Sequence, residues 1–236
     1  TVMVAVNGLV SEVPHVMKLP FDPLKELRPV AELARTGLLL VASPQAQVSD
    51  VKGAVAYIKA RPGKVSFASY SPGSVSHTLG LAFNQIGGTD MVHVGYKGSP
   101  PALVDLMGGV VSFMFDGPAT SVPLVRGGKL QALATTAPQR LGVLPDVPTF
   151  AELGLVNYSP TAWIGLFAPA GTPKPIVDKL ADAMQKAAAQ NPALIEKWQS
   201  YGGELKAMTP EAFAAFLKED NALWGQAIAD TGVKLD

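Results

Sequence analysis

The sequence predicts an α/β protein with a mostly parallel sheet, organised in two lobes. From Val51 onward, apolar strand patterns alternate with helix patterns of about ten residues, which is typical of βαβ units. Two apolar segments, 36–43 and 163–169, flank this block as paired crossover strands would, and each runs into a proline. The composition, 48% apolar and 16% charged, is sufficient to bury a large core.

The first elements follow one another in a regular order. The chain opens with a strand-like run at 1–6 that has no lead-in, which favours a processed or truncated start. Ser49 is expected to cap a helix that places Val51, Val55 and Ile58 on one face. Further strands are expected at 65–69, 91–96, 110–115 and 130–136.

Helices are expected between these strands and in the C-terminal part. One ends near Gly87, and the residues of its apolar face are Leu79, Phe83 and Ile86. The next is capped by Ser99, has Pro100 in its first turn and ends at 108–109, and a short helix follows residue 115. Two longer helices open at Pro173 and Thr209, with apolar stripes that indicate core packing rather than a cofactor site.

Composition and motifs argue against several classes of function. A chain without cysteine has no disulfide, thiolate nucleophile or Cys-type zinc site. Lys plus Arg equals Asp plus Glu, at 19 each, so nucleic acid is not expected as a partner. The three histidines lack metal-ligand spacing, and adjacent Ser76 and His77 are poorly placed for a nucleophile–base pair. With no nucleophile-elbow or phosphate-loop motif, we expect no catalysis, metal or cofactor.

Three strand-to-helix segments are candidates for a binding site. The first lies at 69–77, where free backbone N–H groups, serine hydroxyls and the positive end of a helix dipole suit a carboxylate. Its candidate residues are Ser69, Tyr70, Ser71, Gly73, Ser74, Ser76 and His77. The same segment is equally consistent with an ordinary βα turn in which Ser74 caps the helix.

The second and third segments occupy similar positions. Tyr96, Lys97, Gly98 and Ser99 follow a strand, with a glycine for close backbone approach and a lysine that either attracts an anion or is simply solvated. Asp116 ends the next strand and could accept a hydrogen bond from a ligand, or cap the short helix behind it. His93 lies inside a strand, where a structural role is expected.

Six spaced motifs occur along the chain in a recognisable order. They are Phe21–Val30, Pro62–Ser69, Tyr96–Ser99, Met114–Asp116, Leu144–Thr149 and Ala168–Pro173. With these motifs the chain resembles, from Thr1 to Asp236, the Bug-type receptors, which are the extracytoplasmic solute receptors of tripartite tricarboxylate transporters.

The resemblance implies a type II periplasmic-binding-protein fold, with two α/β lobes joined by two crossover strands. Lobe 1 would comprise 1–43 and 163–236, and lobe 2 would comprise 44–162. The ligand would be a small mono-, di- or tricarboxylate, an acidic amino acid or an aromatic acid, and membrane components of the transporter would be partners. Location in the periplasm and a monomeric state are also implied. The loop at 69–77 would grip a carboxylate, with Asn7 and Gly8 also reaching the cleft.

The chain departs from the family pattern in two places. Tyr70 stands where many relatives have Gly or Ser, and its ring could restrict the ligand or stack on an aromatic acid. Family members also begin with a strand, a Pro-Gly-Gly loop, a helix and a second strand before the segment that matches Thr1. Lobe 1 is therefore expected to be incomplete, and this chain is expected to bind its ligand weakly or not at all.

The resemblance further implies that the lobes close around the ligand by rotation near 43–44 and 161–163. Two alternatives remain open. One is a receptor of the same fold for an ATP-driven transporter. The other is an enzyme on this fold, for which Lys97 and Asp116 are the available polar candidates.

Overall fold

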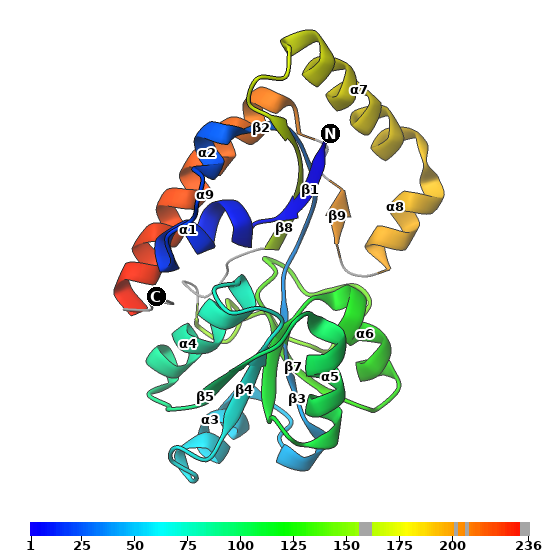
Figure 1. Cartoon of the computed structure of the whole chain (residues 1–236). Coiled ribbons are helices and arrows are strands. Elements are labelled where there is room, and N and C mark those ends of the chain that lie inside the picture. The colour runs from blue at the N-terminus through cyan, green and yellow to red at the C-terminus, as the bar shows by residue number, and fades with distance from the viewer. Residues whose placement is uncertain (156–161, 201–202, 206–207, 232–236) are drawn as a thin grey trace. The chain divides into compact units, whose positions relative to one another are not determined.

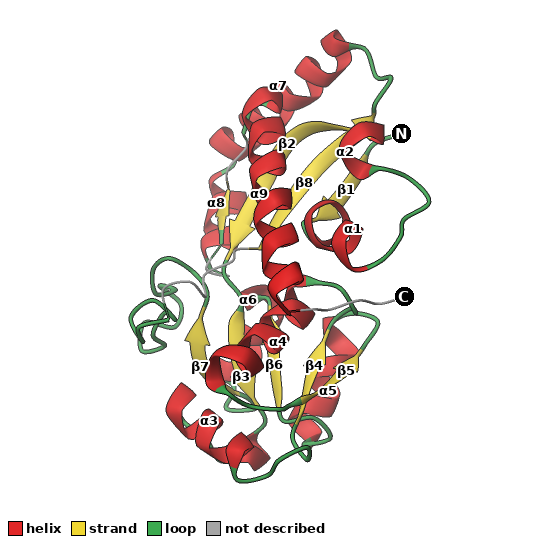
Figure 2. Ribbon diagram, turned by 90° about the vertical axis from the view of Figure 1, so that its left-hand side faces the viewer, coloured by secondary structure: helices red, strands yellow, loops and turns green. Residues whose placement is uncertain are grey.

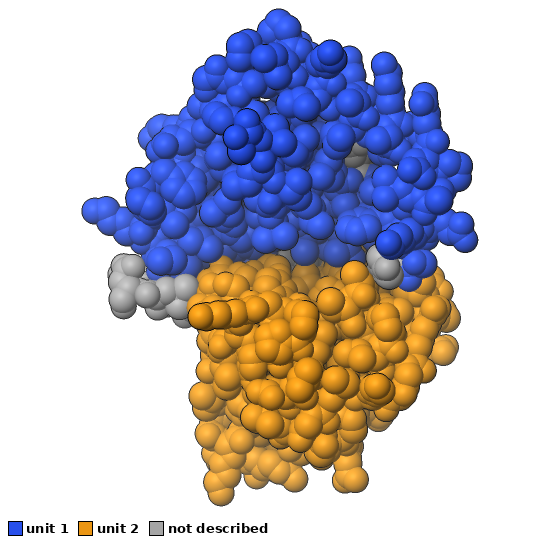
Figure 3. Space-filling view, turned by 45° about the vertical axis from the view of Figure 1, so that its right-hand side comes forward, with its two compact units in different colours: residues 1–36, 162–236 blue, residues 37–161 orange. Residues whose placement is uncertain are grey.

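The computed structural model describes residues 1–155, 162–200, 203–205 and 208–231. The chain divides into two compact units, Thr1–Thr36 with Ala162–Asp236 (unit 1) and Gly37–Thr161 (unit 2), coloured separately in Figure 3. The boundaries expected from the sequence followed residues 43 and 162. In the structure, the first division falls earlier because the strand at 39–42 pairs within the sheet of unit 2.

Unit 2 is built on a five-stranded mixed sheet (Figure 1). Its order is β5 (Val92–Gly95), β4 (Ser66–Ser69), β6 (Phe113–Asp116), β3 (Leu39–Ala42) and β7 (Gln131–Thr135). The β5–β4 and β4–β6 pairs are parallel, whereas β3 runs antiparallel to both β6 and β7. The expectation of a mostly parallel sheet was therefore wrong outside the β4–β5–β6 block, because no crossover helix links β3 to β6 or β7.

Helices cover both faces of this sheet (Figure 2). They are α3 (Val51–Lys59), α4 (Val75–Gly87), α5 (Ser99–Gly108) and α6 (Pro118–Arg126), with a 3₁₀ turn at Pro44–Ala46. Alternate residues of β6 face opposite sides, as the strand pleat requires. Phe113 and Phe115 pack against Tyr57 of α3 and Phe83 of α4. Met114 instead joins the core that α5 and α6 contribute.

Unit 1 contains a second, four-stranded sheet. Its order is β1 (Met3–Val6), β8 (Ala162–Pro169), β2 (Leu27–Thr36) and β9 (Glu204–Leu205), and each neighbouring pair is antiparallel. Around it lie η1 (Gly8–Glu12), α1 (Val13–Val16), α2 (Pro23–Glu26), α7 (Lys174–Gln190), α8 (Pro192–Gln199) and α9 (Pro210–Thr231). The helical turns at 8–16 and the helix α8 were not expected from the sequence.

Strand β8 separates two small cores in unit 1. Trp163 and Phe167 face α9, where each ring lies 5.4 Å from the ring of Phe213. Leu166 and Ala168 form a second cluster that includes Val177 of α7. The alternation of these buried residues along β8 explains why an apolar run of this length forms a strand with both faces covered.

Three details of the expected elements need correction. Asp50, not Ser49, caps α3, because its carboxylate accepts the Gly53 N–H at 2.6 Å. The segment 36–43 is not one strand: β2 ends at Thr36 and β3 begins at Leu39. Helix α4 includes Gly87 and is closed by Gly88. Within the described residues, no helix is long and apolar enough to cross a bilayer.

Candidate functional site

Three helices of unit 2 begin at one edge of its sheet without a side-chain cap. Strands β4, β5 and β6 are parallel, so their carboxyl ends share an edge, and α4, α5 and α6 start there. Among the described residues, no side chain of the cap positions Ser74, Gly98 and Gly117 accepts a first-turn N–H. Helix α3, by contrast, is capped by Asp50. At α4 the uncapped first turn therefore presents backbone N–H donors and the positive end of the helix dipole. The first turns of α5 and α6 contain prolines, which have no N–H, so these two helices contribute mainly the positive ends of their dipoles.

The loop between β4 and α4 (residues 70–74, hereafter the β4–α4 loop) does not cap the first turn of α4, whose residues Val75 and Ser76 are buried. Ser74 occupies the cap position, as expected, but its Oγ donates to the carbonyl of Ser71 at 2.5 Å. The N–H groups of Val75 and Ser76 follow, where a helix has no internal acceptor for them. The Ser76 hydroxyl donates to the carbonyl of Phe115 at 2.5 Å, which binds the start of α4 to β6.

Backbone hydrogen bonds hold the β4–α4 loop beside the β5–α5 loop. The N–H of Tyr96 donates to the carbonyl of Ser69 at 2.9 Å, and the N–H of Gly98 donates to that of Tyr70 at 2.8 Å. Gly98 has φ 108° and ψ 164°, a region that is open essentially only to glycine. Two of the three candidate segments are thus brought together by main-chain contacts.

Asp116 joins the third segment to the second. Its side chain is fully buried and accepts hydroxyl hydrogen bonds from Ser99, from Thr120 at 2.5 Å and from Ser121 at 2.6 Å. Burial raises the pKa of Asp116, while the three hydroxyls and the N–H of Gly117 oppose that rise. Ser99 was expected to cap α5. The cap position is Gly98, and the Ser99 hydroxyl is directed to Asp116 instead.

His77, which is buried, and His93, which is half-buried, form a stacked pair beneath the β4–α4 loop. The imidazole rings stack with their centroids 3.7 Å apart. The Gly73 N–H donates to Nδ1 of His77 at 3.1 Å, and Nε2 of His93 lies 2.7 Å from Oγ of Ser69. Burial, and secondly the neighbouring His93, lowers the pKa of His77 to about 4, and burial also lowers the pKa of His93. Both rings are therefore neutral at pH 7.

The remaining candidates lie at the margin of this edge or in unit 1. The Tyr96 hydroxyl donates to Asp105 at 2.7 Å, and Lys97 is exposed. The amide of Asn7 donates to Oε1 of Glu12 at 2.7 Å, and Gly8 begins the helical turn that follows. Thr161, part of the expected hinge, lies outside the described residues.

Sequence reasoning missed two residues of this edge and one contact. Thr120 and Ser121 were not singled out, although two hydroxyls in the first turn after a buried aspartate are a recognisable signal. His93 was expected to be structural, but its contact with the ring of His77 was not expected. His77 lies in α4 and His93 in β5, so this contact becomes visible only when the packing of α4 on the sheet is known.

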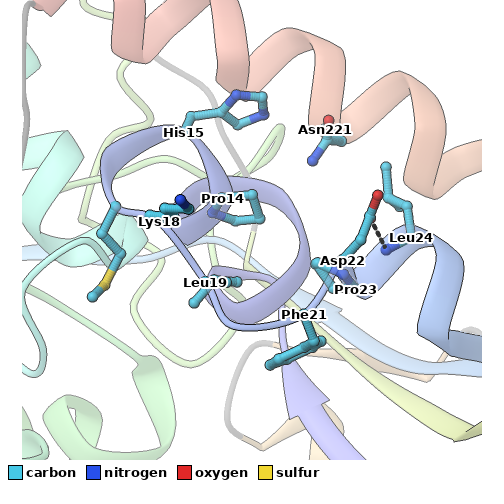
Figure 4. A pocket seen from close by; sticks show the side chains of 10 residues that line it. Pro14, His15, Lys18, Leu19, Phe21, Asp22, Pro23, Leu24 and Asn221 are labelled. Carbon is cyan, nitrogen blue, oxygen red and sulfur yellow. Dashed lines mark hydrogen bonds between the residues drawn. The ribbon is translucent and has the colours of Figure 1, made fainter.

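Unit 1 contains hollows that lie away from the candidate residues. One of about 340 Å³ in unit 1 is lined by Pro14, His15, Met17, Lys18, Leu19, Phe21, Asp22, Pro23, Leu24 and Asn221 (Figure 4). None of these was predicted to bind a ligand. In the described part of the chain, no three His, Asp or Glu side chains gather as they would around a metal ion.

Comparison with known proteins identifies the relatives of this chain. The model of the family described as "Tripartite tricarboxylate transporter family receptor" matches residues 1–233. Protein BugT of Bordetella pertussis is 34% identical over 218 residues, which are 92% of this chain and 66% of BugT. The chain thus spans about two thirds of the length of that relative.

Two solved structures with named ligands share the fold. The structure of MatC from Rhodopseudomonas palustris with bound malate has a TM-score of 0.90 and 32% identity, over 97% of this chain and 79% of that one. The structure of R. palustris Rpa4515 with adipate has a TM-score of 0.94 and 28% identity, over 99% of this chain and 78% of that one. The expected periplasmic-binding-protein fold is thereby confirmed.

Proposed function

The chain belongs to the tripartite tricarboxylate transporter receptor family, and from that premise we propose that it captures a small carboxylate for such a transporter. The family consists of solute-binding receptors rather than enzymes. The partners would be the carboxylate and the membrane components of the transporter, and the place of action the periplasm.

The uncapped start of α4 is the observation that carries this proposal. A serine at a helix N-cap ordinarily accepts a first-turn N–H, but the hydroxyl of Ser74 is turned back to Ser71. The N–H groups of Val75 and Ser76 therefore remain donors for an anion. Each charge-assisted hydrogen bond contributes roughly 1.5–3 kcal/mol, so two such donors supply a large part of the ~8 kcal/mol that micromolar binding requires.

The other members of the site would surround this anchor. Lys97 is the one lysine or arginine among the candidates, and it is exposed, so neutral donors would carry the recognition of charge. Ser99 and Asp116 would border the ligand through the hydroxyl network, because the Ser99 hydroxyl donates to Asp116 and keeps lone pairs to accept from a ligand group. Asn7 and Gly8 of unit 1 are further proposed ligand contacts, with lobe closure as the proposed means of capture.

Dicarboxylates are the proposed ligand class. Malate and adipate, which the two R. palustris proteins hold, share a pair of carboxylates and differ in length and in a hydroxyl group. A panel that contains malate, succinate, adipate, a monocarboxylate, a tricarboxylate and an uncharged diamide would define the class.

The test is a ¹H–¹⁵N NMR titration of the chain with each acid of this panel, because chemical shifts also detect millimolar binding. The amides of Val75 and Ser76 are expected to move with the carboxylates and not with the diamide. The variant V75P removes one N–H at the first helical position, where proline is tolerated, and Ser74 before it is already extended (φ −80°, ψ 166°). Losing one charge-assisted bond is expected to weaken binding about 10- to 150-fold.

V51P is the matched control. It places the same substitution at the first position of α3, behind Asp50 with φ −149° and ψ 173°, away from the candidate edge. Its affinity for carboxylates is expected to equal that of the wild type. Equal weakening by both variants, or shifts that bypass α4 for every acid in the panel, would contradict the proposal.

A further inference from the structure

His77 is tied to the β4–α4 loop by a bond that requires a neutral ring. A backbone N–H can only donate, so the 3.1 Å contact from Gly73 N to His77 Nδ1 needs an unprotonated Nδ1. In the neutral ring the proton is therefore on Nε2. Protonation of Nδ1 would place two N–H donors against one another and abolish this bond.

The surroundings of His77 favour the neutral form from each side. On β4 its neighbour is Phe67, whose ring centroid lies 6.3 Å away. On β5 its neighbour is His93, which is stacked at 3.7 Å and lies 2.7 Å from the Ser69 hydroxyl through Nε2. His93 is the titratable group among them, and it would repel a second positive charge. On β6 the acid is Asp116, whose oxygens accept the hydroxyls of α5 and α6. None of these described neighbours is placed to pair with an imidazolium.

Gly73 is the point at which the loop depends on this ring. It is buried with φ 75°, and it lies between Pro72 and the cap residue Ser74. Pro72 packs on Gly95, so closely that a methyl group added there would lie 2.7 Å from its Cγ, and Gly95 follows His93 by two residues. The histidine pair thus supports the loop both through Gly73 and through the strand on which Pro72 rests.

We propose that His77 is a positioning residue, which holds the β4–α4 loop in its carboxylate-binding geometry while its ring is neutral and releases the loop when the ring is protonated. This inference rests on the proposed function, because it assigns a consequence for carboxylate affinity to the same loop. Ligand binding and protonation of His77 then oppose one another. By linkage, a bound carboxylate must lower the affinity of His77 for a proton as much as the proton lowers carboxylate affinity.

This sign separates the proposal from simple electrostatics. An anion near an imidazole normally raises the pKa of that ring. If the loop geometry governs, a saturating carboxylate instead moves the His77 titration to lower pH. With a pKa of about 4 in the free protein, carboxylate affinity attributable to this group falls about twofold at pH 4 and about tenfold at pH 3.

The experiment is an NMR titration between pH 7 and pH 3 that follows the His77 ring nitrogens and the Gly73 amide. In the free protein, the Gly73 amide is expected to titrate together with His77 and to lose protection from hydrogen exchange about fivefold, which corresponds to one hydrogen bond of about 1 kcal/mol. H77N keeps an acceptor oxygen near the position of Nδ1 but cannot titrate. Its Gly73 amide is expected to stay constant over the same pH range.

Two comparisons complete the test. H77L lacks an acceptor and is expected to show the unprotected Gly73 amide at every pH, and if it does not fold, the wild type and H77N still decide. H15N alters an exposed histidine of unit 1 and is expected to behave as the wild type. The measurements on the free protein do not involve a ligand, so absence of carboxylate binding would count against the proposed function alone. A Gly73 amide that ignores the titration of His77, or a carboxylate that raises the His77 pKa, would overturn the inference.

Discussion

Replacing Gly98 with alanine should lower the free energy of unfolding, the carboxylate affinity or both, without any steric clash. An added Cβ at this position would have Pro100 Cδ, at 3.6 Å, as its one described contact within 4 Å, which is ordinary van der Waals distance. The penalty arises from the backbone, because φ 108° with ψ 164° is a conformation that residues other than glycine adopt only under strain. Such strain costs about 1–3 kcal/mol.

The strain in G98A can appear in two measurable quantities. If the loop keeps its geometry, the free energy of unfolding falls by the full amount. If the peptide rotates, the bond from the Gly98 N–H to the Tyr70 carbonyl is lost, the loops separate, and affinity falls by up to about 5- to 150-fold. The losses in stability and in binding free energy should therefore sum to about 1–3 kcal/mol.

Urea unfolding and an NMR titration with the tightest-binding acid of the carboxylate panel would measure these two losses. G128A is the matched control in the same unit: Gly128 has φ 67°, and no described atom lies within 4 Å of an added Cβ. It should lose about 1 kcal/mol of stability while keeping wild-type affinity. The reasoning is refuted if G98A changes neither quantity, or if G128A lowers affinity to the same extent.

Three further predictions concern stability. Burial, and secondly the neighbouring Asp220, raises the pKa of Glu12. A carboxyl group with a raised pKa in the folded protein makes the protein less stable as the pH rises. The variant E12Q should therefore unfold at a higher urea concentration than the wild type at pH 8, and at the same urea concentration at pH 4. F213A removes the ring packed between Trp163 and Phe167 and should cost about 3–5 kcal/mol in urea unfolding, with F216A as a neighbouring, less buried comparison. The pKa of His77 is lowered from 6.5 to about 4, so between those pH values the imidazole is protonated in the unfolded chain and neutral in the folded protein. As the pH falls across that window, the free energy of unfolding should decrease by about 2 kcal/mol. The variant H77N should lack this part of the decrease.

Much of the candidate edge could be predicted from the sequence because parallel strands impose it. Strands β4, β5 and β6 and the helices behind them follow directly from apolar runs separated by Gly, Pro and Ser. Once the strands are parallel, the residues after Ser69, Gly95 and Asp116 must share an edge. The β4–α4 and β5–α5 loops therefore touch because β4 and β5 pair in parallel, and not because of the residues within the loops.

The direction of individual side chains could not be predicted. Ser74 and Ser99 both carry hydroxyls suited to capping, yet one is turned to Ser71 and the other to Asp116. A hydroxyl has several acceptors within reach in each case, and the choice depends on tertiary neighbours that a local pattern does not contain. The antiparallel direction of β3 was missed for a related reason, because its apolar run is compatible with either direction.

Recognition by main-chain donors has a consequence for how relatives diverge. The N–H groups of Val75 and Ser76 depend on the helix and not on the identity of the side chains, so the proposed carboxylate anchor would survive substitution as long as the loop keeps its shape. Relatives that share only about a third of their residues with this chain retain the fold on which that shape rests. Selectivity among acids must then come from the side chains that border the anchor. Tyr70, half-buried at the start of the β4–α4 loop, is in this position, so its replacement by serine should alter the ranking of aromatic and aliphatic acids more than the requirement for a carboxylate.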